Sequence, residues 1–112
     1  MAPYTQGFSD ELDALEHFEQ HGELLGADTV EQYVELADHF LGALLADMPG
    51  VEECQRPELD WVRYNTGTLE FGAMSEDRST IYTYFIAEPH RLGGRTFRQY
   101  CDDQCSERWN RE

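Results

Sequence analysis

The chain has 112 residues, 40% of them hydrophobic and 28% charged, which is enough for one hydrophobic core but not for two. Its formal net charge of −15 repels polyanions, so composition alone argues against a general nucleic-acid-binding protein. No stretch approaches the roughly 18 apolar residues of a membrane span, and the acidic N-terminal stretch lacks the features of a secretory signal. We therefore expect a single domain over residues 1–112, with no membrane partner and a cytoplasmic location.

The acidic residues are concentrated in the N-terminal half. Residues 1–60 contain 15 of the 23 acidic residues and one basic residue, Arg56, giving a net charge of −14, whereas residues 61–112 have a net charge of −1. All eight basic residues are arginines. A solvated acidic surface is the simpler interpretation. The functional alternative is a nucleic-acid mimic or an acidic inhibitor of a basic protein partner.

Two helices are predicted in the N-terminal half. Ser9 can cap a helix over residues 10–21, whose first turn has two acidic residues at the positive end of the helix dipole and which Gly22 can end. A second helix follows a capping box at residues 29–32. Its apolar residues keep helical spacing as far as Met48, before a Pro-Gly pair.

The second half is predicted to be mainly a sheet. Residues 50–58 are interpreted as a linker, and alternating apolar and polar residues then indicate three strands at 59–65, 69–74 and 81–86. Gly67 is expected to take a positive φ in the first turn. The pattern indicates an antiparallel meander with one face for a core and one face that is unusually aromatic and partly polar.

A loop over residues 87–94 and a short helix over residues 95–108 complete the chain. Helices separate from an antiparallel sheet define the α+β class. The predicted fold is thus two N-terminal helices, an antiparallel three- to four-stranded sheet and a short C-terminal helix.

The three cysteines are Cys54, Cys101 and Cys105. An odd number without a dense framework argues against a disulfide scaffold, and the absence of a CxxC pair argues against a zinc knuckle or a thioredoxin-like site. Cys101 and Cys105 share one helical face, where the simpler interpretation is that they are small apolar side chains.

His17 and His21 are four residues apart, so both lie on one face of the first helix. This spacing allows two imidazoles to share a metal ion, with His39, Glu23 or Asp38 as a further ligand. Phe18 stands where an HExxH motif has its glutamate. A metal site is therefore the weaker interpretation, and we expect neither a metal nor a cofactor.

The residues also fit metal-independent cleavage of RNA. RNA supplies its own nucleophile, the 2′-hydroxyl, so such an enzyme needs an acid or base near neutrality and a fixed cation for the charge that develops on phosphorus. The candidates are a histidine (His21 or His17), Arg63 and Thr83 on strands, and Arg95 or Arg98 entering from the loop side.

A third interpretation involves no catalysis. Aromatic side chains on the strands could form a binding surface, although alternating aromatics are more often core residues and cross-strand pairs. The residues concerned are Trp61, Tyr64, Tyr82, Tyr84 and Phe85.

The order of three segments resembles a known family. The segments HFEQHGELLGA, TVEQYVELADHFL and DWVRYNTGTLEFGAMSEDRSTIYTYF are similar in order and spacing to the toxin domains of the barnase–EndoU–colicin–RelE-like nuclease superfamily, of the colicin D-like type. The matching features are a His21-Gly22 step, a Thr-x-Glu-x-Tyr helix and an Ile-x-Thr-Tyr-Phe strand. The resemblance covers about residues 8–100, and it implies a nuclease-like core over about residues 8–105.

The resemblance implies a ribonuclease that acts on tRNA. His21 matches the catalytic histidine, Thr83 the strand hydroxyl and Arg63 a basic residue facing the substrate, with His17 as a second catalytic candidate. A cognate immunity protein is an implied partner. The remaining candidates are the expected substrate-binding residues: Tyr64, Asn65, Tyr82, Arg91, Arg95 and Arg98. The alternative is a catalytically inactive acidic module that binds a basic protein.

Overall fold

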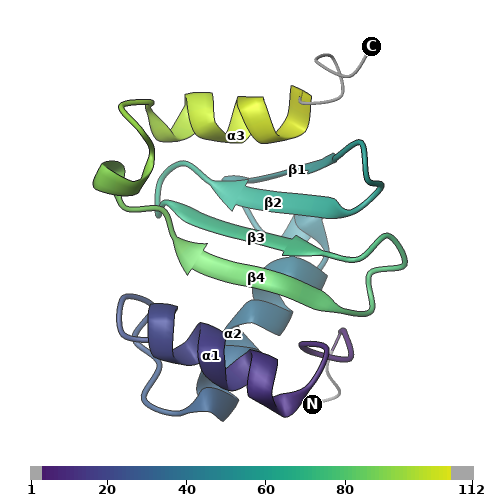
Figure 1. Ribbon diagram of the computed structural model, residues 1–112. Helices are drawn as coiled ribbons and strands as arrows, with labels where there is room; N and C mark the ends of the chain where they lie inside the picture. The colour runs from purple at the N-terminus through teal and green to yellow at the C-terminus, as the bar shows by residue number, and fades with distance from the viewer. Residues whose placement is uncertain (1–3, 107–112) are drawn as a thin grey trace.

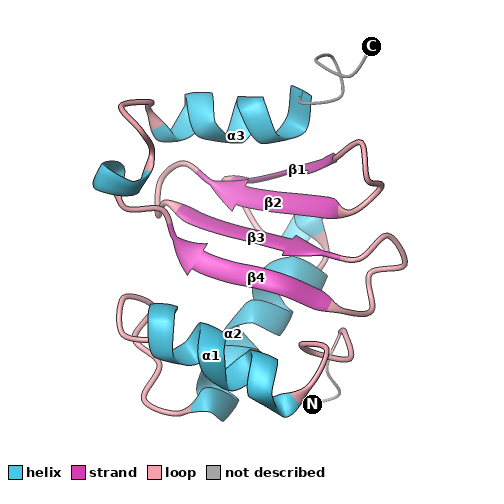
Figure 2. Cartoon of the chain, in the orientation of Figure 1, coloured by secondary structure: helices cyan, strands magenta, loops and turns pink. Residues whose placement is uncertain are grey.

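The computed structural model describes residues 4–106, apart from the side chains of Arg91 and Ser106. Figures 1 and 2 show two helices, four strands and a third helix in chain order, with two short 3-10 turns at Leu45–Asp47 and Pro89–Arg91. The helices and strands are α1 (Glu11–His21), α2 (Val30–Gly42), β1 (Val51–Gln55), β2 (Trp61–Asn65), β3 (Glu70–Met74), β4 (Ile81–Ile86) and α3 (Phe97–Ser106). The α+β prediction is confirmed.

The four strands form one antiparallel sheet in the order β1-β2-β3-β4. β1 lies within the predicted linker, so that prediction was wrong for residues 51–55. The consecutive acidic residues Glu52 and Glu53 interrupt the alternation of apolar and polar residues that indicates a strand, but arginines neutralise both charges in the fold. Arg98 binds Glu52, and Arg63 and Arg78 bind Glu53.

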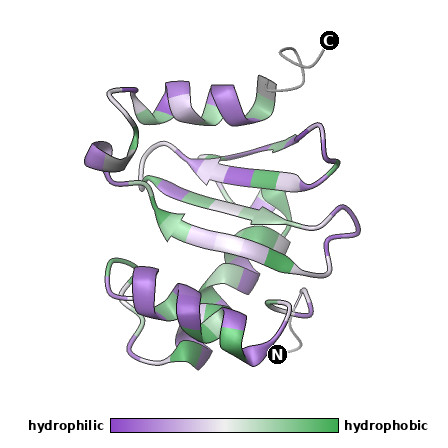
Figure 3. Ribbon diagram, in the orientation of Figure 1, coloured by the Kyte–Doolittle hydropathy of each residue, from purple (hydrophilic) through white to green (hydrophobic). Residues whose placement is uncertain are grey.

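Each face of the sheet packs into a core, so the prediction that only one face serves a core was wrong. In Figure 1, α2 lies behind the sheet and α1 lies alongside β4, while α3 lies at the other end, near β1. One core joins α1 and α2 to Met74, Ile81 and Tyr84, and the other joins α3 to Val62 and Phe71. Figure 3 shows that α2 is the most hydrophobic helix, as expected for the helix that packs against the back of the sheet.

The helix termini follow local hydrogen bonding. Asp10, rather than Ser9, caps α1 by accepting a hydrogen bond from the Asp13 backbone N–H at 2.7 Å. Thr29 caps α2 as predicted, with 3.1 Å from the Gln32 N–H to its Oγ1. α2 ends at Gly42, six residues before the predicted end, because the chain turns to an extended conformation at Ala43.

Two turns also differ from the sequence prediction. Leu59 and Leu69 take positive φ values of 73° and 68°, so β2 and β3 begin one or two residues later than expected. Gly67 is not among the residues with positive φ. Its N–H is bound instead by the side chain of Asn65, at 2.8 Å, in an Asx turn that does not need the glycine conformation.

Cys54 of β1 and Cys105 of α3 form a disulfide bond. The interpretation of Cys105 as an apolar filler was therefore wrong, because β1 brings a cysteine beneath the end of α3. Cys101 is free and fully buried, as the simpler interpretation predicted. Within residues 4–106, no helix has the length and apolar character needed to cross a membrane.

Candidate functional site

A pocket of about 340 Å³ opens between α1 and α3 on the face of the sheet that α3 covers. Its walls come from α1, from β4, from the segment between β4 and α3, and from α3 itself. The lining residues are His17, Gln20, His21, Thr83, Phe85, Ala87, Leu92 and Tyr100. Three of the four catalytic candidates, His17, His21 and Thr83, therefore lie at one pocket.

Helix periodicity places both histidines on the pocket side of α1, with their ring centroids 6.0 Å apart. Each ring rests on an aromatic neighbour: His17 stacks on Phe8 at 5.1 Å and His21 packs against Phe85 at 5.3 Å. These contacts fix the planes of the two imidazoles. The site thus holds two proton-transfer groups in a defined arrangement.

The two nitrogens of His17 differ in their surroundings. Nε2 lies 3.5 Å from the Oδ1 of Asp13, one turn earlier in the same helix. Nδ1 is buried and has no hydrogen-bond partner among the described residues. A buried ring nitrogen without a partner is uncommon in folded proteins, and it leaves this atom a hydrogen-bonding capacity that the fold does not use.

Thr83 projects toward the pocket because of the register of the sheet. It is paired with Ala73, and Phe85 is paired with Phe71, so both share the face that packs against α3. Gln20 and Tyr100 add an amide and a phenol to the lining. Burial raises the pKa of the Tyr100 hydroxyl above its ordinary value, so this group is a neutral hydrogen-bond donor near neutral pH.

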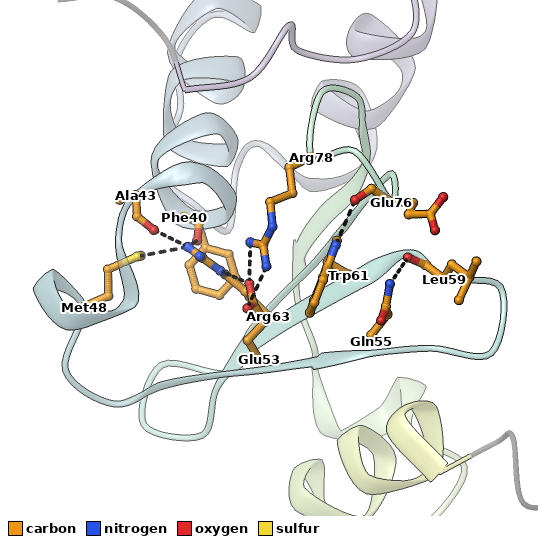
Figure 4. A network of polar contacts seen from close by, with 10 residues as sticks. All are labelled: Phe40, Ala43, Met48, Glu53, Gln55, Leu59, Trp61, Arg63, Glu76 and Arg78. Carbon is orange, nitrogen blue, oxygen red and sulfur yellow. Dashed lines mark hydrogen bonds and ion pairs between the residues drawn. The ribbon is translucent and has the colours of Figure 1, made fainter.

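Arg63 lies on the opposite face of the sheet. Its side chain is only 4% exposed, and its Nε donates to Oε1 of Glu53 at 2.8 Å. Its Nη1 donates to the carbonyls of Phe40 and Ala43 at the end of α2, at 3.2 and 2.6 Å (Figure 4). Arg63 therefore ties α2 to the sheet and does not line the pocket.

Glu53 is the centre of this polar network. Burial alone would raise its pKa, but hydrogen bonds from Arg78 and Arg63 outweigh burial and hold the pKa of the Glu53 carboxyl below its ordinary value. Figure 4 shows both guanidinium groups converging on this carboxylate. The network is a structural link between β1, β2 and α2.

The remaining arginine candidates lie near α3. The Nε of Arg95 donates to the Leu92 carbonyl at 2.9 Å, and its guanidinium lies 5.2 Å from the centre of the Tyr100 ring, beside the pocket. Its Nη1 contacts the exposed carboxylate of Asp103. Arg98 points elsewhere, over Tyr64 and onto the carboxylate of Glu52. The side chain of Arg91 lies outside the described residues.

The other predicted substrate-binding residues do not line the pocket. Tyr64 is buried and packs edge-on against Phe97 at 6.3 Å, and Asn65 forms the turn after β2. Tyr82 is 48% exposed. The aromatic residues of the strands are thus mainly core residues, with Tyr82 as the exposed exception.

Sequence reasoning missed four lining residues: Gln20, Ala87, Leu92 and Tyr100. A signal existed for Gln20, because residues three and four apart on α1 lie on the same face as the histidines. No local pattern indicates that Leu92 and Tyr100 reach the pocket, since their position depends on how α3 docks. Among the described side chains, no group of three or more His, Cys, Asp or Glu residues is placed to hold a metal ion.

No protein-family model matches this chain, and no curated protein has significant similarity to it. The structural class of the protein is therefore defined by its fold and its candidate site alone. It is an α+β domain with a histidine-lined pocket beside the outer strand of an antiparallel sheet.

Proposed function

We propose that the protein is a metal-independent endoribonuclease whose active site is the pocket between α1 and α3. The observation that supports this proposal is the presence of two fixed imidazoles and the Thr83 residue at one 340 Å³ pocket. Two histidines can supply both the base and the acid that cleavage beside a 2′-hydroxyl needs. The resemblance to colicin D-like nucleases favours tRNA as the substrate.

His21 would act as the general base. It would remove the proton of the 2′-hydroxyl, whose oxygen then attacks the adjacent phosphorus and forms a cyclic phosphate. His17, oriented by Asp13, would protonate the departing 5′-oxygen, so that one proton is taken up and one is released. Thr83 and Gln20 would hold the phosphate oxygens by hydrogen bonds.

Arg95 would be the cation for the developing charge, in place of Arg63. It lies two residues before α3, beside the pocket, held by the Leu92 carbonyl and the Tyr100 ring. Its carboxylate partner, Asp103, is 56% exposed, and exposed ion pairs are weak enough to exchange for a phosphate. Because Arg95 is the main cation beside the pocket, few counterions are released on binding, and cleavage should depend only weakly on salt concentration.

The test is cleavage of total tRNA in EDTA by four proteins: wild type, His21→Ala, His17→Ala and the control His39→Ala. His39 is exposed on α2 and does not line the pocket. We expect each pocket variant to lose at least 100-fold in rate and the control to keep wild-type activity. A wild-type protein that leaves tRNA intact at both low and moderate salt would refute the proposal.

A second candidate function is a catalytically inactive acidic module that binds a basic protein. It is favoured by one observation: five arginines, Arg56, Arg63, Arg78, Arg95 and Arg98, each contact a carboxylate of the chain itself. Because these arginines are already paired, the carboxylates of α1 and α2 dominate the electrostatic field around the protein. Salt-sensitive binding to a lysine-rich protein, without cleavage of RNA, would favour this candidate.

Three further assignments belong to the first proposal. A cytoplasmic site of action would give the enzyme access to tRNA. A cognate immunity protein would be needed by a cell that makes an active tRNA nuclease. Such an inhibitor would be expected to cover the pocket, so its binding should protect His21 from chemical modification by diethyl pyrocarbonate.

A further inference from the structure

α3 contributes one wall of the pocket, and its only covalent cross-link to the sheet among the described residues is at its C-terminal end. Tyr100 lines the pocket from the middle of the helix, and Leu92 lines it from the segment just before. At the C-terminal end, Cys105 is bonded to Cys54 of β1, which is 51 residues earlier in the sequence. The position of the wall thus depends on the link between α3 and β1.

The N-terminal end of α3 is preceded by two consecutive glycines with positive φ, Gly93 at 61° and Gly94 at 84°. A Cβ placed on either glycine would have no neighbouring heavy atom within 4 Å. The backbone here is uncrowded, and glycine has the widest choice of φ and ψ. These two residues have the properties of a hinge.

The contacts between the hinge and the disulfide are limited. The apolar face of α3 consists of the buried Phe97 and Cys101 and the partly buried Tyr100 and Cys105, with Tyr100 packed edge-on against Phe71 at 5.3 Å. The polar links are an exposed pair between Arg98 and Glu52 and a hydrogen bond from Arg56 to Gln104 at 2.7 Å. Exposed ion pairs contribute little to stability, and two buried and two partly buried side chains, one of them part of the disulfide, are a small docking surface.

We propose that α3 is a hinged wall of the pocket whose docking is controlled by the redox state of the Cys54–Cys105 disulfide. With the disulfide formed, both ends of α3 are fixed and Tyr100 completes the pocket. A dithiol reductant transfers two electrons and two protons to the disulfide, giving two cysteine thiols and the oxidised, cyclic disulfide of the reductant. The C-terminal end of α3 is then released, and the helix rotates away about Gly93 and Gly94.

Cys101 gives the fold a built-in reporter of this movement. Its thiol is fully buried while α3 is docked. Burial raises its pKa to about 12, so it is a poor nucleophile and leaves the neighbouring disulfide intact. When α3 is released, the thiol becomes accessible and its reactivity returns to that of an ordinary cysteine.

The experiment measures alkylation of Cys101 by iodoacetamide under native conditions, by peptide mass spectrometry, before and after treatment with dithiothreitol. The double variant Cys54→Ser/Cys105→Ser reproduces the reduced state without reductant, and Cys101→Ser identifies the labelled peptide. We expect Cys101 to react at least tenfold faster in the reduced protein and in the double variant. Hydrogen exchange should show that the amides of α3 lose far more protection than those of α2.

Three results would overturn the proposal: three free thiols in the protein purified without reductant, unchanged protection of Cys101 after reduction, or an equal loss of protection in α2 and α3. The last would mean that the disulfide stabilises the whole domain rather than one wall. An effect on RNA cleavage rests on the function proposed above. If Cys101 responds as expected but neither redox state cleaves tRNA, the proposal of a hinged wall is supported and the proposal of nuclease activity is refuted.

Discussion

Replacing Arg63 separates a structural role from a catalytic one. Arg63→Met keeps a similar buried volume but removes the guanidinium that donates to Glu53 and to the carbonyls of Phe40 and Ala43. Losing the donor to each buried carbonyl costs about 1 kcal/mol, and losing the buried ion pair costs about 1–2 kcal/mol because Arg78 still neutralises Glu53. We expect the free energy of unfolding to fall by about 3–4 kcal/mol.

The assay is urea unfolding followed by tryptophan fluorescence, with Arg98→Met as the matched control. Arg98 forms an exposed pair with Glu52, so its loss should change the unfolding midpoint only slightly. RNA cleavage by folded Arg63→Met should remain within a few-fold of wild type, because Arg63 does not line the pocket. A variant with wild-type stability and no cleavage would refute the structural role of Arg63 and support a direct role in binding the substrate.

Three further predictions concern stability. The pKa of the Glu53 carboxyl in the folded protein is below its ordinary 4.5, so ionised Glu53 stabilises the fold above about pH 4.5, and this stabilisation is lost as the pH falls through the folded pKa. Glu53→Gln should therefore flatten the acid side of a plot of unfolding free energy against pH. An unchanged slope would contradict this prediction. Gly72→Ala would place a Cβ 3.0 Å from Cδ2 of Leu41 and should lower the unfolding free energy by about 1–2 kcal/mol in the urea assay. Unchanged stability would show that α2 can shift away from the sheet without cost. Tyr33→Phe removes the buried hydrogen bond to the Tyr84 carbonyl and should cost about 1 kcal/mol, measured by thermal unfolding; a more stable variant would contradict the importance of that bond.

The sequence was sufficient for elements whose signal is local. Helical spacing predicted α1 and α2, the Thr29 cap was correct, and strand alternation predicted β2, β3 and β4 within two residues. The pairing of His17 with His21 also follows from helical spacing. Each of these features depends on residues only a few positions apart.

The rest depends on contacts between distant residues. β1 looks polar because Glu53 finds Arg78, 25 residues later in the chain, only after folding. Alternation shows that Arg63 shares a face with Asn65, but it does not show which face contains the pocket when helices cover both. The disulfide likewise needs the docking of α3 on β1, which no spacing of cysteines encodes.

The segment before α1 has a consequence for association between copies of the chain. Gln6 N–H donates to the Ser79 carbonyl at 2.7 Å, Ile81 N–H donates to the Gly7 carbonyl at 2.8 Å, and Phe8 forms a parallel bridge with Ile81. Asp38 of α2 anchors this segment by accepting from the N–H and hydroxyl of Thr5. The start of β4 is therefore already hydrogen-bonded along its outer side, which denies an incoming strand the free backbone groups that edge-to-edge aggregation requires.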